Sequence, residues 1–342
     1  MRVLVIGGTG FLGYHATHEL VRRGHEVTVL GLPPAPAADL FPDAVAVQLV
    51  NVAAADDGQL RDVVAGYDAI VFAAGADDRA VPTEPAHKFF YEANVRTSVR
   101  VTAAARQAGA GKLVILGSYF TYFDRLWPDM TIAEDHPYVY SRREQTQLCT
   151  AVAGSDMALV VLELPYIFGA MPGAVPLWAP LIRYVRSGLP LYYTNGGTNM
   201  IAVAHVAQAI AGAVERVDSS AIFQVGDENV SWTRFLKALC KAVGRKDDTI
   251  KIVEDDKVLG MGWVGDALHS LRGKEAGLHS RDFVQIQIAE TYFDPQASRS
   301  VLGYGAGGLE QAWLDTVAAC PETSGVTRLN RFVGNMRQWF GH

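Results

Sequence analysis

Cysteine is scarce in this 342-residue chain, and its scarcity excludes several classes of protein. The three cysteines, Cys149, Cys240 and Cys320, are far apart and odd in number. They form neither a disulfide framework nor a metal-binding pattern. Free, widely spaced thiols suit a reducing compartment, so we expect a cytoplasmic protein that holds no metal.

Basic blocks and long apolar runs are also missing. Lys and Arg number 30 against 36 Asp and Glu, for a formal net charge of −6, and no cationic cluster stands out. A nucleic-acid partner is therefore not expected. No apolar stretch approaches the roughly 20 residues that cross a bilayer, so no membrane partner is expected either.

Hydrophobic side chains are plentiful, at 49% of the residues against 19% charged, so a large core is easily built. Apolar runs of strand length alternate with helix-like stretches, which predicts a parallel sheet covered on both faces. The predicted strands are Val3–Ile6, Glu26–Leu30, Val45–Val50, Ala69–Ala73, Lys112–Leu116 and Ala158–Leu162. The predicted helices between them are Tyr14–Arg23, Gln59–Val64, His87–Gln107 and Tyr138–Ala153.

The first strand runs directly into a glycine-rich turn, Ile-Gly-Gly-Thr-Gly-Phe-Leu-Gly over residues 6–13. A strand, a tight glycine turn and a helix start form the corner that binds the diphosphate of a dinucleotide. Free N–H groups and the positive end of the helix dipole then face the anion. The alternative is a purely structural strand-to-helix turn.

The second predicted strand lacks the residue that usually reads the adenosine ribose. Gly31 stands where NAD-binding folds place an acid, and no arginine follows to pair with a 2′-phosphate. Preference between NAD and NADP is therefore open. Asn51, after the third strand, is a candidate for the adenine edge, with a turn-forming asparagine as the alternative.

Small or polar residues follow the next two strands, where the carboxyl ends of a parallel sheet face the binding crevice. Ala73, Ala74 and Gly75 would let the backbone approach a cofactor, or form a plain turn. Ser118 could bind a substrate oxygen, or serve turn chemistry. Asn94 has poor helix propensity, so it either faces solvent or has a task.

The helix expected after Asp135, its predicted N-cap, places Tyr138 and Arg142 four residues apart on one face. A cation at ~4 Å in a dielectric of ~20 is worth roughly 4 kcal/mol, or about three pKa units. We therefore expect Arg142 to bring the Tyr138 phenol toward neutral pH, where acid–base catalysis is efficient. Tyr140 with Arg143 is the rival pair, and a surface contact is the plain alternative.

Together these residues resemble the extended short-chain dehydrogenase/reductase superfamily, in particular the NAD-dependent epimerase/dehydratase family. Gly7–Gly13 is similar to its glycine motif, and Pro137–Arg142 to its Tyr-x-x-Ser-Lys motif, with Arg142 in place of the lysine. Glu163, Met200 and His205 also depart from the family pattern. The resemblance implies catalytic roles for Tyr138, Ser118, Arg142 and Asn94. It implies cofactor contacts from Gly7, Gly10, Phe11, Leu12, Gly13, Asn51, Ala73, Ala74, Gly75, Tyr138, Arg142, Pro165 and Ile167.

After Pro165 the chain becomes rich in proline and aromatic residues, which is typical of a smaller substrate lobe. We predict a doubly wound α/β Rossmann domain from residues 1–165 and about 201–228, and a lobe from 166–200 and about 229–342. A helix over Ile201–Val217, a strand over Ala221–Val225 and a helix over Trp232–Val243 are expected. Apolar residues at helical spacing from Leu329 to Phe340 predict a terminal helix, either docked or at an interface or membrane surface.

The predicted function is NAD(P)-dependent hydride transfer at a carbonyl or alcohol carbon of a small-molecule or sugar-nucleotide-like substrate, with tyrosine as acid and base. Reduction, epimerisation and dehydration share this chemistry and stay open. By analogy with the family, a homodimer is expected through helices 87–107 and 138–153. The alternative is a cofactor-binding sensor or scaffold without redox turnover, which the arginine at position 142 favours.

Overall fold

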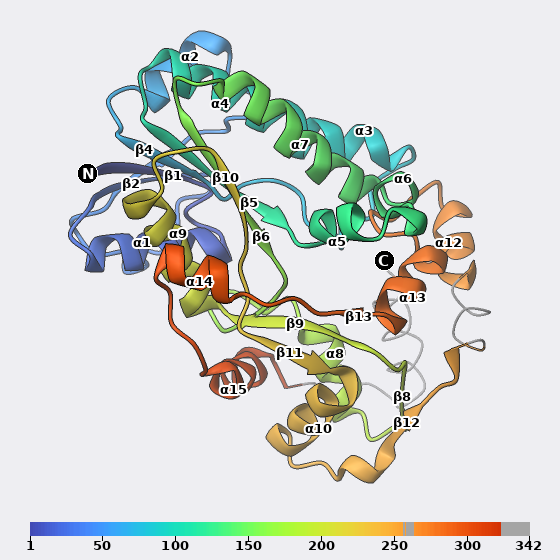
Figure 1. The fold of residues 1–342 in the computed structure, drawn as a ribbon. Coiled ribbons are helices and arrows are strands. Elements are labelled where there is room, and N and C mark those ends of the chain that lie inside the picture. The colour runs from blue at the N-terminus through green and yellow to red at the C-terminus, as the bar shows by residue number, and fades with distance from the viewer. Residues whose placement is uncertain (256, 258–262, 323–342) are drawn as a thin grey trace.

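The computed structural model describes residues 1–255, 257 and 263–322 (Figure 1). Its centre is a seven-stranded sheet in which every neighbouring pair is parallel. The strands lie in the order β10-β6-β5-β4-β1-β2-β3. Their bounds are β1 Arg2–Ile6, β2 Glu26–Gly31, β3 Ala46–Leu49, β4 Ala69–Phe72, β5 Lys112–Ser118, β6 Ala158–Leu164 and β10 Ala221–Gln224.

Helices cover both faces of this sheet (Figure 1). Alternate residues of β1 point to opposite sides, so Val3 and Val5 join one core while Leu4 and Ile6 join the other. The first core is covered by α1 Phe11–Arg22 and α9 Val203–Arg216. The second lies under α2 Asp57–Val64, α4 Thr97–Gln107 and α7 Pro137–Ala153. The predicted doubly wound α/β fold is confirmed.

The strand order reverses at β1. The chain runs outward from β1 to β2 and β3, and β4 then returns to the other side of β1. In open α/β sheets such a switch point leaves a crevice at the carboxyl ends of the strands. The turns after β1 and β4 therefore meet at one place, and the ends of β5 and β6 lie beside it.

A second, smaller sheet is built from β9 Gly197–Ala202, with β7 Tyr166–Phe168, β11 Glu228–Ser231 and β13 Glu290–Thr291 as its neighbours. Its core is aromatic, with Phe168, Trp232, Phe235 and Trp313 all buried. Around it lie α8 Ala179–Arg186, α10 Trp232–Ala242, α13 Ser280–Ile288, α15 Leu309–Ala319 and the pair β8 Leu191–Tyr193 and β12 Ile250–Ile252. Helix α12 Trp263–Ser270 packs on α13, and α14 Gln296–Leu302 packs on α9 beside the large sheet.

Four expectations need correction. The predicted helix over Ile201–Val217 begins only at Val203, because Ile201 and Ala202 end strand β9. The predicted helix His87–Gln107 is three segments: α3 Ala86–Phe90, a π-helical turn Tyr91–Arg96, and α4. Strand β3 is exposed rather than buried, since it is the edge of the sheet. The N-cap of α7 is His136, not Asp135, whose carboxylate accepts a hydrogen bond from Thr131 instead.

The expected terminal helix from Leu329 to Phe340 lies outside the described residues. The proposed division into two domains stays a prediction. The remaining short helices, α5 Phe120–Leu126, a 3₁₀ turn Pro128–Met130 and α6 Ile132–Asp135, connect β5 to the start of α7. A 3₁₀ turn at Asp247–Thr249 precedes β12.

Candidate active site

The glycine turn after β1 is packed too tightly for side chains. Gly7 has φ +80°, and a Cβ there would lie 2.7 Å from the carbonyl oxygen of Ala73. The N–H groups of Gly7 and Gly8 both donate to the carbonyl of Leu30, at 2.9 and 3.1 Å, so the turn is fixed against β2. Gly10 is the N-cap of α1 and offers no side-chain hydrogen bond. The first N–H groups of α1 are therefore available to an anion, as the diphosphate of a dinucleotide requires.

Backbone from two further places lies beside this turn. Ala73 donates its N–H to Ile6 at 2.8 Å, which brings the end of β4 beside the glycines. His15 in α1 contacts the carbonyl of Ala170 at 2.9 Å, and the ring of Phe11 packs toward Gly169. The segment that follows Pro165 and Ile167 is thus held over the start of α1. These residues fit a dinucleotide, and their contacts with it stay a prediction.

Two residues at the adenosine end have local partners. The side-chain oxygen of Asn51 accepts a hydrogen bond from the N–H of Ala53 at 3.1 Å, which is the turn-forming arrangement, and Asn51 is exposed. Its role toward adenine stays a prediction. A Cβ at Gly31 would stand 2.7 Å from the Thr9 hydroxyl oxygen, so the Thr9 side chain occupies the space of the missing acid.

Ser118, Tyr138 and Arg142 come together at the carboxyl end of β5. Ser118 ends that strand, and Tyr138 and Arg142 lie in the first turns of α7. The three are buried, with Tyr138 7% and Arg142 8% exposed, so a surface contact is excluded. The Arg142 guanidinium carbon lies 5.2 Å from the centre of the Tyr138 ring. The rival Tyr140 instead contacts Arg143 and His87.

The expectation that Arg142 makes Tyr138 acidic is wrong for the protein alone. Burial raises the pKa of Tyr138 above its ordinary value of 10.0, and this outweighs the lowering by the Arg142 charge and by hydrogen bonding from Ser118 and Arg142. The negative charge of Asp78 raises it further. Tyr138 therefore keeps its proton at neutral pH, which suits a proton donor.

Asn94 ties the loop after β4 to α7. It is fully buried within the π-helical turn, so it does not face solvent. Its side-chain oxygen accepts from the N–H of Ala76 at 2.8 Å, and its side-chain nitrogen donates to Ser141 at 3.0 Å. π-helical turns occur often at functional sites. Asn94 thus links the loop after β4 to α7, while its catalytic role stays a prediction.

Sequence reasoning missed Asp78. Asp78 follows the small residues at the end of β4, and its charge acts on Tyr119, Tyr138 and Tyr166. Burial raises the pKa of the Asp78 carboxyl, and Arg79, 3.8 Å away, lowers it. Tyr119 donates to or accepts from Thr198 at 2.8 Å, and its ring lies 6.1 Å from that of Tyr166. The sequence did carry a signal for Asp78, because an acidic residue that follows a strand at the carboxyl edge of the sheet lies near the binding crevice.

The three departures from the family pattern have internal partners. Glu163 is buried and accepts hydrogen bonds from Thr121 at 2.5 Å, Gln224 at 2.7 Å and Arg125 at 2.8 Å. Met200 is buried in the aromatic core of the smaller sheet. His205 pairs with Asp227 at 2.8 Å, and Asp227 also accepts the N–H of Ala202 just before α9.

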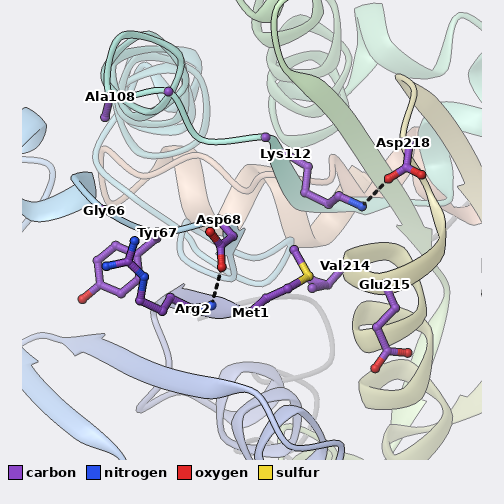
Figure 2. A pocket seen from close by; sticks show the side chains of 12 residues that line it. Met1, Arg2, Gly66, Tyr67, Asp68, Ala108, Lys112, Val214, Glu215 and Asp218 are labelled. Atoms are coloured by element: carbon purple, nitrogen blue, oxygen red, sulfur yellow. Dashed lines mark hydrogen bonds and ion pairs between the residues drawn. The ribbon is translucent and has the colours of Figure 1, made fainter.

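A pocket of about 520 Å³ opens at the opposite, amino edge of the sheet (Figure 2). Two of its charged side chains, Lys112 and Asp218, contact each other at 3.2 Å, and Lys112 also donates to the carbonyl of Val217 at 2.6 Å. Asp68 accepts the N–H of Arg2 at 2.6 Å. Lys112 begins β5 and Ser118 ends it, so this pocket is separate from the Tyr138 cluster.

The sequence pattern of the NAD dependent epimerase/dehydratase family matches residues 3–226. The chain belongs to this family. Among its relatives is the 3-diazoavenalumate denitrifying reductase of a Streptomyces species, 30% identical over 65% of this chain and 73% of that protein. The 4-hydroxy-2-methyl-3-oxo-4-farnesyl-3,4-dihydroquinoline-1-oxide ketoreductase of Stigmatella aurantiaca is 28% identical over 72% of this chain and 74% of that protein.

Solved structures share the fold. The crystal structure of gox2253 has a TM-score of 0.75 at 20% identity and covers 93% of this chain and 97% of its own. MoeE5, solved with UDP-glucuronic acid and NAD, has a TM-score of 0.65 at 19% identity and covers 93% and 98%. Family and relatives together indicate an NAD(P)-dependent enzyme of the short-chain dehydrogenase/reductase type. Within the described residues no helix is long and apolar enough to cross a membrane.

Proposed function

We propose that this protein is an NAD(P)-dependent reductase of a small-molecule carbonyl compound, with Tyr138 as the proton donor. The observation that carries the proposal is the buried cluster of Tyr138, Ser118 and Arg142 at the carboxyl end of β5, beside the glycine turn. The bound cofactor supplies the hydride that reaches the carbonyl carbon.

Tyr138 gives its phenolic proton to the carbonyl oxygen as that oxygen becomes an alcohol. Because burial raises the pKa of Tyr138, the phenol is fully protonated before the reaction and a donor is ready. Ser118 donates a hydrogen bond that orients the same oxygen. Arg142 then stabilises the phenolate left behind, since its charge favours the ionised form. Net reduction is thus favoured over epimerisation and dehydration, which need the reverse proton transfer as well.

Charge at the site favours a substrate other than a nucleotide sugar. Asp78 places a carboxylate among Tyr119, Tyr138 and Tyr166, and a diphosphate would be repelled there. Glu163 and Met200 are both buried, and neither side chain is of a type that binds phosphate. Aromatic walls suit a flat, apolar ketone, and one relative is by name a ketoreductase of a dihydroquinoline-1-oxide. We infer a neutral or cationic ketone of this kind.

A homodimer in the cytoplasm completes the proposal. Its interface would use α3, the π-helical turn, α4 and α7, where large apolar side chains are exposed: Phe89 40%, Tyr91 44% and Leu148 36%. Light scattering on the pure protein tests it, and a monomer at micromolar concentration would refute this part.

The experiment is oxidation of NADH and NADPH, followed at the reduced-nicotinamide absorbance band, over a panel of aromatic ketones and nucleotide sugars. Tyr138→Phe is the diagnostic variant, and Tyr140→Phe, on the same helix, is the matched control. We expect turnover with a ketone that falls at least about a hundredfold in Tyr138→Phe and stays in the control. Unchanged turnover in Tyr138→Phe would remove the catalytic assignment. Cofactor binding without turnover on any compound would favour a sensor or scaffold.

A further inference from the structure

Four residues around the active site form a closed cycle of hydrogen bonds. Asn94 accepts the N–H of Ala76 at 2.8 Å through its side-chain oxygen, and Arg142 donates through Nη2 to the carbonyl of Ala76 at 3.1 Å. Arg142 donates through Nη1 to the side-chain oxygen of Gln145 at 2.9 Å. The side-chain nitrogen of Gln145 donates to the backbone carbonyl of Asn94, also at 2.9 Å, and closes the cycle.

This cycle fixes the Arg142 side chain firmly. Gln145 is 1% exposed and lies one helical turn after Arg142, so its amide has no alternative partner in water. The cycle passes Gly75, where a Cβ would stand 2.6 Å from the side-chain oxygen of Asn94. The hydrogen bonds of the cycle therefore hold the Arg142 guanidinium at both Nη1 and Nη2.

The partners of Arg142 leave its charge intact. Apart from Tyr138, its acceptors are the carbonyls of Ala76 and Leu116 and the amide of Gln145, all of them uncharged. A carboxylate at position 145 would hold the guanidinium equally well but would cancel its field at Tyr138. A neutral amide holds the cation in place without cancelling it.

One donor of Arg142 has no partner. Its Nε is buried without a hydrogen bond, and a buried unpaired donor carries a penalty of about 1–3 kcal/mol. The family motif that Pro137–Arg142 resembles has a lysine at this position. A ribose hydroxyl beside Arg142 would satisfy the unpaired Nε–H, so the arginine fits the cofactor.

We propose that Gln145 is the positioning residue that lets an arginine serve where the family uses a lysine. It holds Nη1 by an uncharged hydrogen bond, which leaves the Nε–H as a donor for a bound cofactor and keeps the positive charge beside Tyr138. The inference rests on the proposed function for the role of Tyr138, while its effect on cofactor binding is independent of any substrate.

Two substitutions of Gln145 distinguish its two effects on Arg142: it holds the side chain by a hydrogen bond, and it does so without a negative charge. Gln145→Met removes both hydrogen bonds at similar volume, so Arg142 is released. Gln145→Glu keeps the acceptor for Nη1, loses the donor to the Asn94 carbonyl and adds a negative charge. Gln147→Glu, exposed and two residues further along α7, is the matched charge control. The probes are NADH and NADPH, titrated by fluorescence.

We expect Gln145→Met to weaken binding of the preferred cofactor about tenfold, the loss of one hydrogen bond to a charged group. Gln145→Glu should bind within about threefold of the unsubstituted protein, because Arg142 is still held. If Gln145→Met and Gln145→Glu bind the cofactor with equal affinity, the proposal that Gln145 holds Arg142 is overturned. If Gln145→Met does not fold, Gln145→Asn, too short to reach Nη1, replaces it in the same comparison.

The effect on Tyr138 is read by NMR of protein labelled with ¹³C at the tyrosine ζ carbon, with NAD⁺ bound. The Tyr138 resonance is assigned by its absence in Tyr138→Phe. Gln145→Glu should move the Tyr138 titration to higher pH by about one unit or more, whereas Gln147→Glu should leave it in place. No movement in Gln145→Glu would overturn the proposal. Failure of the proposed function would appear separately, as turnover that survives in Tyr138→Phe.

Discussion

The hydroxyl oxygen of Thr9 lies 2.7 Å from the point where a Cβ on Gly31 would stand. Thr9 belongs to the glycine turn and Gly31 ends β2, so two different elements meet where the sequence predicts the adenosine ribose. The space that an acid would need is already filled. The absence of a ribose-reading carboxylate is thus part of the packing and not an isolated change.

The first prediction concerns cofactor preference. With no carboxylate at position 31 to repel a 2′-phosphate and no arginine beside it to attract one, NADH and NADPH should bind with dissociation constants within about tenfold of each other. Fluorescence titration of both cofactors measures this. A difference of a hundredfold or more would mean that another residue discriminates between them.

The same packing predicts how preference can be installed. Gly31→Asp alone should destabilise the protein, because the new Cβ meets Thr9. Adding Thr9→Ala removes the two closest atoms, Cγ2 and Oγ1, and leaves only the Cβ at 3.2 Å, so the double variant should fold and should prefer NADH by at least about tenfold. Thr9→Ala alone is the control and should keep the original ratio. If Gly31→Asp is as stable as the unsubstituted protein, the contact with Thr9 does not prevent an acid at position 31.

The second prediction concerns Gly75, which has φ +130°. Gly75→Ala should cost about 1–3 kcal/mol from backbone strain, and more because its Cβ would strike the side-chain oxygen of Asn94. Gly109→Ala is the control, since Gly109 has φ +77° and nothing within 4 Å of a Cβ. Chemical denaturation compares the two. Equal losses of unfolding free energy would show that the Asn94 contact adds nothing.

Much of the fold could be predicted because hydrophobic periodicity and glycine positions are local signals. The strand–turn–helix at Gly7–Gly13 and the alternation of strands and helices could be predicted from residues close together in the sequence. The predicted helix His87–Gln107 hid the π-helical turn around Asn94, because a single inserted residue barely changes the apolar period. Ile201 was placed in a helix since a short apolar run fits either structure.

The site was predictable where residues lie on one element and not where they come from several. Helical spacing correctly placed Arg142 beside Tyr138. Their spacing carried no information on burial, which depends on the whole fold and raises the pKa of Tyr138. Asp78 and Gln145 were missed because their importance depends on contacts with residues more than 50 positions away.

The third prediction concerns Asp78. Asp78→Asn removes a negative charge that raises the pKa of Tyr138, so this pKa should fall, by up to about one unit. The alkaline limb of the pH–rate profile for ketone reduction should move to lower pH accordingly. Asp77→Asn, exposed and paired with Arg79, is the matched control. Coincident profiles for Asp78→Asn and the unsubstituted enzyme would exclude Asp78 from the site.

The fourth prediction concerns His136, the N-cap of the helix that carries Tyr138. His136 is 1% exposed, and its Nδ1 accepts the N–H of His279 at 3.0 Å, which requires the neutral ring. Burial lowers its pKa to about 4, and the charge of His279 lowers it while Asp135 and Asp266 raise it. An unfolded histidine titrates near 6.5, so the unfolded state binds the proton first as pH falls.

Its contribution to stability is therefore complete above about pH 6.5 and falls by up to about 3 kcal/mol as pH drops to about 4. His136→Asn, whose amide oxygen can accept the same N–H, should remove that part of the slope. Urea unfolding between pH 4 and 7 measures it, and His87→Asn, an exposed histidine, is the control. Carboxylates titrate alike in all three proteins and cancel in the difference. Parallel slopes for His136→Asn and the unsubstituted protein would mean that His136 is protonated within the fold at little penalty.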